Sequence, residues 1–323
     1  MRIPSFHDVR EAHERIRAFV HRTPVFTSSS VNQLLGGDFY FKCENFQKVG
    51  AFKFRGATHA VLLLPDEVAQ RGVATHSSGN HAAALALAAR NRGIRAYVVM
   101  PETSPGVKVK AVRGYGADIT FCKPTLADRE STLQNILEQT GAVAIHPYDN
   151  FDVIAGQGTA AKELIEDCPK LDRMLCPVGG GGLLAGTALS VKALSPATRL
   201  IACEPAGADD AFRSFYGGKI FPSMNPRTIA DGLLTSLGER NFWIIREKVD
   251  AVVTVSEASI VEAMRLIWER MKIIVEPSSA VPLAAVIEGK IDVAGKKTGI
   301  LLSGGNVDLE KLPFSVHFPG KSE

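Results

Sequence analysis

The stretch GAFKFRGA, residues 50–57, places Lys53 between two phenylalanines in a short, largely apolar run. A lysine in apolar surroundings has a lowered pKa, because desolvation disfavours its ammonium form. A neutral amine can attack a carbonyl and form a Schiff base. The alternative is a lysine whose stem is buried while its head reaches water. Residue type alone favours that alternative, so a second observation is needed to decide.

A run of four glycines lies far along the chain from this lysine. Gly179, Gly180, Gly181 and Gly182 follow the apolar segment RMLCPV and precede the helical pattern LLAGTALSVKAL. Glycine lets backbone N–H groups approach an anion, and a helix N-terminus adds partial positive charge. We therefore predict a phosphate-binding loop rather than only a tight turn. The run does not match the P-loop pattern, because no lysine follows at the required spacing, and this disfavours a P-loop.

The glycine loop also matches a dinucleotide-binding pattern. Gly180, Gly182 and Ala185 satisfy G-x-G-x-x-[GA], and Glu204 lies near the end of the next predicted strand. This arrangement is typical of nicotinamide-dependent dehydrogenases, which makes that class an alternative interpretation. Combined with Lys53, however, a phosphate loop favours a phosphorylated aldehyde as cofactor. Pyridoxal 5′-phosphate is that molecule.

Two further motifs have both a structural and a functional interpretation. SSGNH, residues 77–81, lies between a predicted strand and a predicted helix. It could hold a carboxylate at the helix N-terminus or serve as an ordinary N-cap turn. EPAGADD, residues 204–210, collects three acidic residues. Hard cations prefer such oxygen ligands, although a solvated acidic loop is the favoured interpretation on sequence alone.

The elements that must position these motifs are strands alternating with helices. The predicted strands cover residues 39–43, 72–76, 94–100, 117–122, 142–148, 173–178, 199–205, 250–256 and 298–305. Nearly continuous apolar strands separated by helices predict an α/β fold with parallel sheets covered by helices on both faces. Ligands of such sheets bind at the carboxyl ends of the strands. The candidate site therefore includes Ser77–His81, Gly179–Gly182, Glu204 and Ser303.

Length and composition limit the classes of function. The chain has 323 residues, 46% of them hydrophobic and 22% charged, with a net charge of +3. This is ordinary for a globular protein of one large domain or two lobes. No dense Lys/Arg run indicates nucleic acid, and no apolar run is long enough for a membrane span. Five scattered cysteines without CxxC, and no apolar signal region, predict a cytoplasmic protein.

Taken together, the motifs resemble the fold-type II pyridoxal-phosphate enzymes, the tryptophan-synthase-β-like class. Within that class they are most similar to serine racemases, serine/threonine dehydratases and 3-hydroxyaspartate dehydratases. The resemblance runs nearly end to end, and this ordered set is far more specific than any one member. Its motifs occur in the family's order: HRTPVFTSS, KCENFQKVGAFKFRGA, THSSGNH, VIAGQGT, PVGGGG, EPAGADD, WERMK, VEPSSA and LLSGGNVD. The resemblance implies a large domain of residues 1–53 and 148–323 and a small mobile domain of residues 54–147 that closes over substrate.

The resemblance also implies where the cofactor would lie. Lys53 would hold it covalently and then act as the general base, with Phe52 beside the ring. The glycines of residues 179–182 would cradle its phosphate. Asn80 would bond its ring hydroxyl, and Ser303 would face its pyridine nitrogen as a neutral partner.

Substrate and metal ligands follow from the same resemblance. The residues expected to bind the substrate amino acid are Ser77, Ser78, Asn80, His81 and Arg129. A divalent cation, Mg²⁺, Mn²⁺ or Ca²⁺, would be held by Glu204, the backbone carbonyl of Ala208, and Asp210. This role removes Glu204 from the dinucleotide interpretation.

The implied reaction is racemisation of serine together with elimination of water from L-serine and related β-hydroxy amino acids, which gives a keto acid and ammonia. Ser78 would be the acid/base group on the face opposite Lys53, where many threonine dehydratases have alanine. Three alanines follow His81 where the family more often has a glutamine, which leaves the substrate preference open. A threonine/serine or 3-hydroxyaspartate ammonia-lyase without racemisation is the nearest alternative, and a non-catalytic amino-acid or nucleotide sensor is a distant one.

The resemblance carries one expectation about regulation and assembly. Serine racemases bind ATP at a dimer interface, so a homodimer with ATP as an effector is expected here. The residues that resemble those ATP ligands are Ser28, Ser29, Lys48, Tyr115, Lys272 and Asn306.

Overall fold

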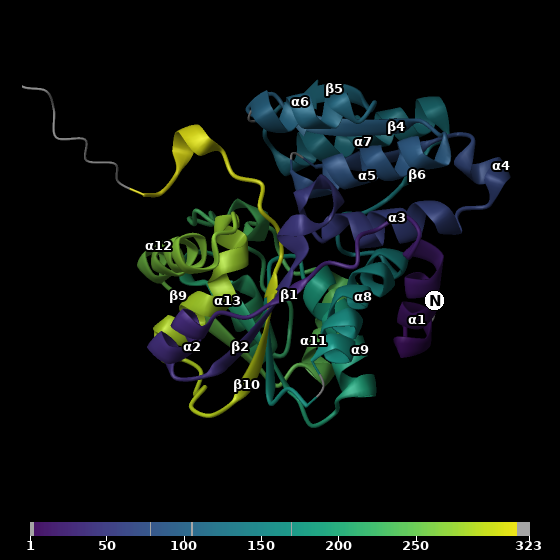
Figure 1. The fold of residues 1–323 in the computed structure, drawn as a ribbon. Coiled ribbons are helices and arrows are strands. Elements are labelled where there is room, and N and C mark those ends of the chain that lie inside the picture. The colour runs from purple at the N-terminus through teal and green to yellow at the C-terminus, as the bar shows by residue number, and fades with distance from the viewer. Residues whose placement is uncertain (1–2, 78, 105, 169, 315–323) are drawn as a thin grey trace, which may run out of the picture.

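Two parallel sheets organise the chain (Figure 1). The computed structural model describes residues 3–77, 79–104, 106–168 and 170–314. One sheet has the strand order β1-β2-β10-β7-β8-β9 and the other the order β5-β4-β3-β6. The named strand pairs are parallel except β1–β2, which is antiparallel. The predicted α/β class with parallel sheets is therefore confirmed.

The strands are β1 (Val25–Phe26), β2 (Asp38–Cys43), β3 (Val73–His76), β4 (Ala96–Pro101), β5 (Asp118–Cys122), β6 (Val143–Ala144), β7 (Arg173–Pro177), β8 (Arg199–Pro205), β9 (Ala251–Val255) and β10 (Lys297–Leu302). The α-helices are α1 (Phe6–Ile16), α2 (Ser29–Leu35), α3 (Lys53–Leu63), α4 (Asp66–Ala69), α5 (Asn80–Arg92), α6 (Gly106–Gly114), α7 (Leu126–Thr140), α8 (Phe151–Asp167), α9 (Gly182–Leu194), α10 (Asp210–Gly217), α11 (Glu239–Lys248), α12 (Glu257–Leu266) and α13 (Pro277–Ile287).

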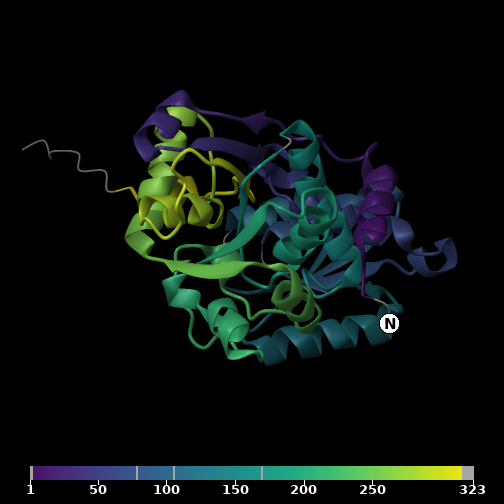
Figure 2. The ribbon, with the colours of Figure 1, turned by 90° about the horizontal axis from the view of Figure 1, so that it is seen from below.

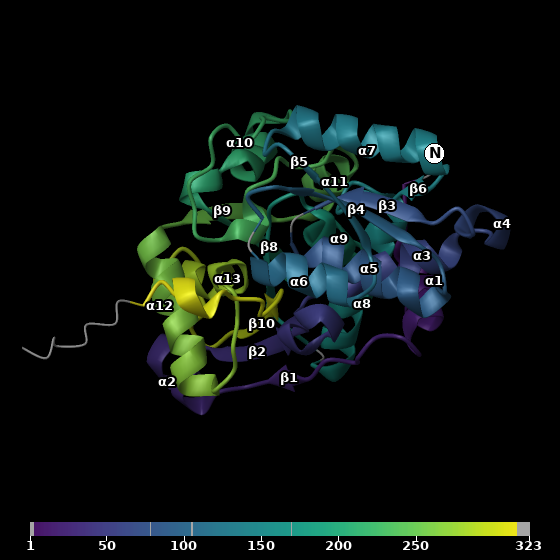
Figure 3. The same ribbon diagram turned by 90° about the horizontal axis from the view of Figure 1, so that it is seen from above.

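Helices cover both faces of each sheet, as near-continuous apolar strands require. On the four-stranded sheet, α5 packs on one face and α7 on the other (Figure 3). On the six-stranded sheet, α12 and α13 lie on one face, and α8, α9 and α11 lie on the other. Helix α1 packs against α8 and α9 (Figure 2). Among the described helices, none is long and apolar enough to cross a membrane.

The strand predicted for residues 142–148 is much shorter than expected. Only Val143 and Ala144 pair with β3. The chain then turns, because His146 Nδ1 accepts the backbone N–H groups of Tyr148 and Asp149 at 3.4 and 2.8 Å. Pro147 has no N–H to donate to a ladder. This turn leads out of the small sheet and into α8.

Helix α8 holds the starts of α3 and α9 in place through contacts that only glycine permits. A Cβ on Gly156 of α8 would lie 2.6 Å from the Cα of Gly56 in α3. A Cβ on Gly158 would lie 2.7 Å from the carbonyl oxygen of Gly186 in α9. Two helices thus approach α8 at backbone distance, and they begin at Lys53 and at Gly182. Their packing sets where the candidate lysine lies relative to the glycine loop.

A buried cluster of charges ties α3 to α8 and β2. The Arg55 guanidinium donates to both oxygens of Glu44 and both oxygens of Glu163, at 2.7–2.8 Å. Lys42 Nζ donates to Glu163 and to the carbonyl of Thr23, both at 2.7 Å. These four charged side chains are almost completely buried. Two cations and two anions are therefore mutually compensated, which is what a buried charge requires.

The four strands β3–β6 fall within the predicted small domain of residues 54–147, and the six strands of the other sheet fall outside it. That the small domain moves relative to the rest stays a prediction.

Replacing Arg55 should unfold the protein far more easily than replacing an exposed arginine. Arg55→Met removes the cation between Glu44 and Glu163 and leaves two buried carboxylates with one buried cation, Lys42. We expect a loss of about 3 kcal/mol or more in the free energy of unfolding. Arg22→Met, which removes partly exposed ion pairs to Glu166 and Asp167, should cost about 1 kcal/mol or less. Urea unfolding measures both, and equal losses would contradict the account.

Candidate active site

One cavity of about 370 Å³ brings together residues from both sheets. It is lined by the first residues of α3, α5 and α9, by Ser303 just past β10, and by Glu276 and Ser278 at the start of α13. The predicted residues that line it are Phe52, Lys53, Ser77, Asn80, His81, Arg129, Gly179, Gly180, Gly181, Gly182 and Ser303. Ser78 lies outside the described residues. The predicted cation ligands Glu204, Ala208 and Asp210 are not among its lining residues.

Lys53 is the first residue of α3 and has no carboxylate partner among the ion pairs of the described residues. Its Nζ donates to the carbonyl oxygen of Pro147 at 2.8 Å and lies 5.1 Å from the ring centroid of Phe52. Burial lowers the pKa of Lys53 to about 8, although the nearby Glu276 carboxylate opposes the shift. Near neutral pH this amine is therefore neutral far more often than an ordinary lysine, as a Schiff-base lysine requires.

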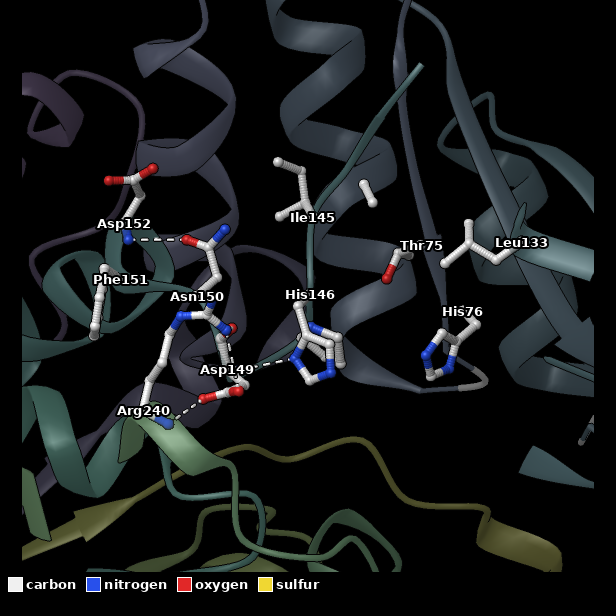
Figure 4. A pocket seen from close by; sticks show the side chains of 12 residues that line it. Thr75, His76, Leu133, Ile145, His146, Asp149, Asn150, Phe151, Asp152 and Arg240 are labelled. Atoms are coloured by element: carbon white, nitrogen blue, oxygen red, sulfur yellow. Dashed lines mark hydrogen bonds and ion pairs between the residues drawn. The ribbon is translucent and has the colours of Figure 1, made fainter. Parts of the chain in front are cut away.

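The segment that contains Pro147 also lines a second cavity, shown in Figure 4, and hydrogen bonds there hold the segment in place. Besides donating its own N–H to His146, Asp149 accepts from the backbone N–H and the Nη1 of Arg240 in α11, at 2.8 and 3.2 Å. Burial lowers the pKa of His146 to about 4, so its ring stays neutral and Nδ1 remains an acceptor. This second cavity holds neither Lys53 nor the glycine loop, so we assign the chemistry to the first.

The glycine loop between β7 and α9 is shaped by close packing. A Cβ on Gly180 would lie 2.4 Å from the Tyr148 ring, and one on Gly179 would lie 2.8 Å from the Cα of Leu233. Gly181 has φ +91°, which a side chain rarely adopts. The first intrahelical bond of α9 runs from Ala185 N to Gly181 O, so the N–H groups of the first turn have no acceptor within the helix. A phosphate fits this cradle.

Ser303, just past the end of β10, lies beside the start of α3. Its backbone carbonyl accepts from Phe52 N at 3.0 Å, and its Oγ lies 3.1 Å from the Oγ of Ser279. Ser279 Oγ in turn bonds the backbone N–H and carbonyl of Gly304 at 2.7 and 2.6 Å. Both hydroxyls are buried. Ser303 can therefore offer a neutral hydroxyl to a ligand atom, held in place from behind.

The polar residues of the SSGNH motif have different surroundings. His81 is buried, and its Nε2 lies 3.2 Å from the carbonyl of Ile145. Burial lowers the pKa of His81 to about 3, so the ring is neutral and uses its one N–H on Ile145. The side chain of His81 is therefore not free to bind a carboxylate, whereas its backbone N–H lies in the first turn of α5, where anions are stabilised. Ser77 Oγ accepts from Gly79 N at 3.3 Å.

Sequence reasoning missed several residues of the site, among them Tyr148, Glu276 and Ser279. The ring centroid of Tyr148 lies 5.9 Å from Lys53 Nζ, and the ring packs on the glycine loop. Glu276 and Ser279, from the VEPSSA motif, contact Asn80 and Ser303. The one signal that could have found Glu276 is a carboxylate inside an apolar run immediately before Pro277.

The acidic loop lies apart from the cavity. Both oxygens of Glu204 accept backbone N–H groups, from Ala211 at 2.9 Å and Phe212 at 2.8 Å. Burial raises the pKa of Glu204 to about 9, with Asp210 and Asp209 adding to the shift. Asp210 Oδ2 accepts from Leu237 N, while its Oδ1 is buried without a partner. Across the described residues, no three His, Cys, Asp or Glu side chains cluster as a metal site. Two buried carboxylates, one of which has an oxygen without a partner, fit a cation that also uses a backbone carbonyl.

The residues expected to bind ATP are only partly brought together within one chain. Tyr115 and Asn306 line a neighbouring cavity of about 620 Å³, together with Lys108 and Lys311. Ser28, Ser29, Lys48 and Lys272 are not among its lining residues.

This geometry defines a two-sheet α/β protein with a buried lysine facing a phosphate cradle. The chain belongs to the pyridoxal-phosphate dependent enzymes, because the family model with that description matches residues 16–304. It is 50% identical to a β-hydroxyaspartate dehydratase of Paracoccus denitrificans, over 98% of this chain and 100% of that one. It is 51% identical to a serine racemase of Dictyostelium discoideum, over 94% and 95% of the two chains.

Solved structures agree with the sequence comparisons. The crystal structure of serine racemase from Dictyostelium discoideum matches with a TM-score of 0.90 at 52% identity, covering 94% of this chain and 99% of that one. The crystal structure of a bacterial threonine deaminase matches with a TM-score of 0.90 at 46% identity, covering 97% and 100%. The predicted fold and family are therefore confirmed, and the dinucleotide interpretation of the glycine loop is not needed.

A methyl group in the glycine loop should abolish the phosphate cradle. In Gly180→Ala the new Cβ would meet the Tyr148 ring, which itself packs near Lys53. We expect the affinity for pyridoxal phosphate to fall at least tenfold, because the loop or the tyrosine must move. Gly114→Ala, where a Cβ meets open space, should bind as the parent protein does. Fluorescence titration of the two apoproteins measures this, and a Gly180→Ala protein of unchanged affinity would contradict the cradle.

Proposed function

We propose that this chain is a pyridoxal-phosphate-dependent serine racemase that also eliminates water from L-serine and related β-hydroxy amino acids, giving a keto acid and ammonia. The observation that carries the proposal is Lys53, a buried amine without an ionic partner, in one cavity with the glycine loop and Ser303. Relatives of about 50% identity that are named serine racemase and β-hydroxyaspartate dehydratase support it.

Bound in this cavity, pyridoxal phosphate would supply an electron-withdrawing ring that acidifies the α-hydrogen of an attached amino acid. Lys53 would hold the cofactor and, once free, take the α-proton with its neutral amine. Pro147 holds Lys53 Nζ on one side of the cavity. Gly179–Gly182 would bind the phosphate, with Phe52 beside the ring and Asn80 on the ring hydroxyl. Ser303 would meet the ring nitrogen with a neutral hydroxyl, which leaves that nitrogen without a proton donor as strong as a carboxylic acid.

The substrate would be held from the small sheet. Ser77, Asn80 and the backbone N–H of His81 surround the N-terminus of α5, where a carboxylate is stabilised. Closure of the proposed small domain, residues 54–147, would exclude water from the reacting atoms.

Arg129 gives one specific reason to keep 3-hydroxyaspartate dehydratase as a second candidate function. Its Nε is buried without a partner, and the residue lines the same cavity. A guanidinium with a free donor is suited to the second carboxylate of a dicarboxylic amino acid. A panel of β-hydroxy amino acids with chiral product analysis separates the two candidates.

The covalent attachment tests the proposed function directly. Protein saturated with pyridoxal phosphate, reduced with borohydride and digested should carry the cofactor on Lys53, and the unreduced protein should convert L-serine to D-serine and pyruvate. Lys53→Ala should show neither the adduct nor turnover. Absence of the adduct from the parent protein would overturn the proposal.

Ser78 is proposed as the acid/base group on the second face of the substrate. In Ser78→Ala we expect conversion of L-serine to D-serine to fall about a hundredfold or more, since a positioned proton-transfer group contributes that much. Elimination from L-serine needs only Lys53 on the first face and should partly survive. Chiral chromatography of both products measures the two rates, and equal loss of both would show that Ser78 has no such role.

We also propose that Glu204, the carbonyl of Ala208, and Asp210 bind Mg²⁺, Mn²⁺ or Ca²⁺. Without a cation, the raised pKa of Glu204, about 9 against an ordinary value near 4.5, means that ionisation destabilises the fold. Cation-free stability should therefore fall as the pH rises from about 4.5 towards about 9. EDTA should then lower the unfolding temperature more at a pH of about 8 than at about 6, and Glu204→Gln should remove the difference. Thermal unfolding that EDTA leaves unchanged at both pH values would contradict the site.

A cytoplasmic homodimer with ATP as effector completes the proposal. The expected effector residues Ser28, Ser29, Lys48 and Lys272 are not among the residues that line the cavity with Tyr115 and Asn306. A site completed by a second subunit would account for this.

A further inference from the structure

We propose that Glu276 is a positioning residue that sets the orientation of the Asn80 amide, so that Asn80 presents N–H, and not its carbonyl, to an oxygen of the bound cofactor. This inference rests on the proposed function, because the oxygen acceptor is that of pyridoxal phosphate.

The contacts around Asn80 allow one orientation of its side chain. Asn80 Nδ2 donates to Glu276, at 3.1 Å from both carboxyl oxygens. Asn80 Oδ1 accepts from Asn306 Nδ2 at 2.9 Å. A carboxylate only accepts hydrogen bonds, and an amide NH₂ only donates them. A rotation of the Asn80 amide by half a turn would therefore place two acceptors together on one side and two donors together on the other.

The orientation of Asn306 is itself specified. Its Nδ2 also donates to the backbone carbonyl of Val49 at 2.7 Å. A backbone carbonyl only accepts, so the NH₂ of Asn306 must lie on the side of Val49 and Asn80. Hydrogen bonds from Val49 through Asn306 and Asn80 to Glu276 thus direct one N–H of Asn80 at the carboxylate. Asn80 lines the cavity, and the second hydrogen of its Nδ2 is left to donate to a ligand.

The stability of the fold does not explain why residue 276 is a glutamate, because its side chain neither caps a helix nor joins an ion pair of the described residues. It precedes Pro277 at the start of α13, yet its side chain makes no capping bond to that helix. It forms none of the ion pairs that join the described residues, although its side chain is buried. The charged groups that face it are Lys53, Lys108 and Asp231. Burial and Asp231 raise its pKa to about 7, so this carboxylate is costly to keep, and the Asn80 amide is the hydrogen-bond partner that most opposes the shift.

Glu276→Gln tests the inference with almost no change in volume. One of the two atoms facing Asn80 Nδ2 becomes an NH₂ donor, which weakens the constraint on the amide. We expect the dissociation constant for pyridoxal phosphate to rise roughly tenfold, the cost of one hydrogen bond to a charged group. A hydrogen bond from Asn80 favours the ionised ring oxygen, so the apparent pKa in the visible absorption of the bound cofactor should also rise.

Two comparisons separate positioning from folding. Glu262→Gln, at an exposed position of α12, should leave both the affinity and the visible spectrum unchanged. Asn306→Ala removes the hydrogen bond from Asn306 to Asn80 Oδ1, which is the second bond that orients the Asn80 amide. It should change the spectrum in the same direction as Glu276→Gln. A Glu276→Gln protein that has lost stability in urea but keeps the parent spectrum and affinity would overturn the inference.

Failure of this inference and failure of the proposed function give different results. If the parent protein takes up cofactor on Lys53 and Glu276→Gln binds it with the same affinity and spectrum, only the role of Glu276 is wrong. If the parent protein takes up no cofactor on Lys53, the proposed function is wrong and this inference is wrong with it.

Discussion

The backbone-to-backbone packing of α3 and α9 on α8 is the contact on which the site depends. Gly56, Gly156, Gly158 and Gly186 have no room for a Cβ, so three helices meet more closely than side chains permit. Because α3 begins at Lys53 and α9 begins at Gly182, this packing fixes the distance between the amine and the phosphate cradle. A methyl group at any of these glycines would push two helices apart and so shift Lys53 relative to the glycine loop, although the glycine itself does not line the cavity.

Burial has opposite consequences for two cations on the same helix. Arg55 is surrounded by Glu44 and Glu163, so its charge is compensated and ties α3 to the core. Lys53, two residues earlier, is given a backbone carbonyl and two aromatic rings instead of a carboxylate. The partners of Arg55 offset the cost of burying its charge, whereas at Lys53 only the nearby Glu276 carboxylate opposes desolvation, and the pKa of Lys53 falls. Buried groups whose pKa is shifted in this way cluster at functional sites.

Much of the fold follows from local pattern. The strands at residues 38–43, 173–177 and 199–205 are close to their predicted bounds, because an apolar run between turn residues is a local property. The strand predicted at residues 142–148 was mostly wrong, since its apolar pattern continues past Ala144 while Pro147 and the His146 turn end the pairing. The two-residue strand β1 was missed because it is too short to show a period.

The sequence by itself determined which residue types could do chemistry: a lysine in an apolar run, four glycines before a helix, and a serine after the last strand. It did so because each signal lies within a few neighbouring residues. Only the tertiary structure decided that the Pro147 carbonyl holds Lys53, that Tyr148 packs on Gly180, and that Glu276 meets Asn80 across 196 residues of chain. A hydrogen-bond partner so distant in sequence leaves no local pattern, since it depends on how whole helices and sheets pack.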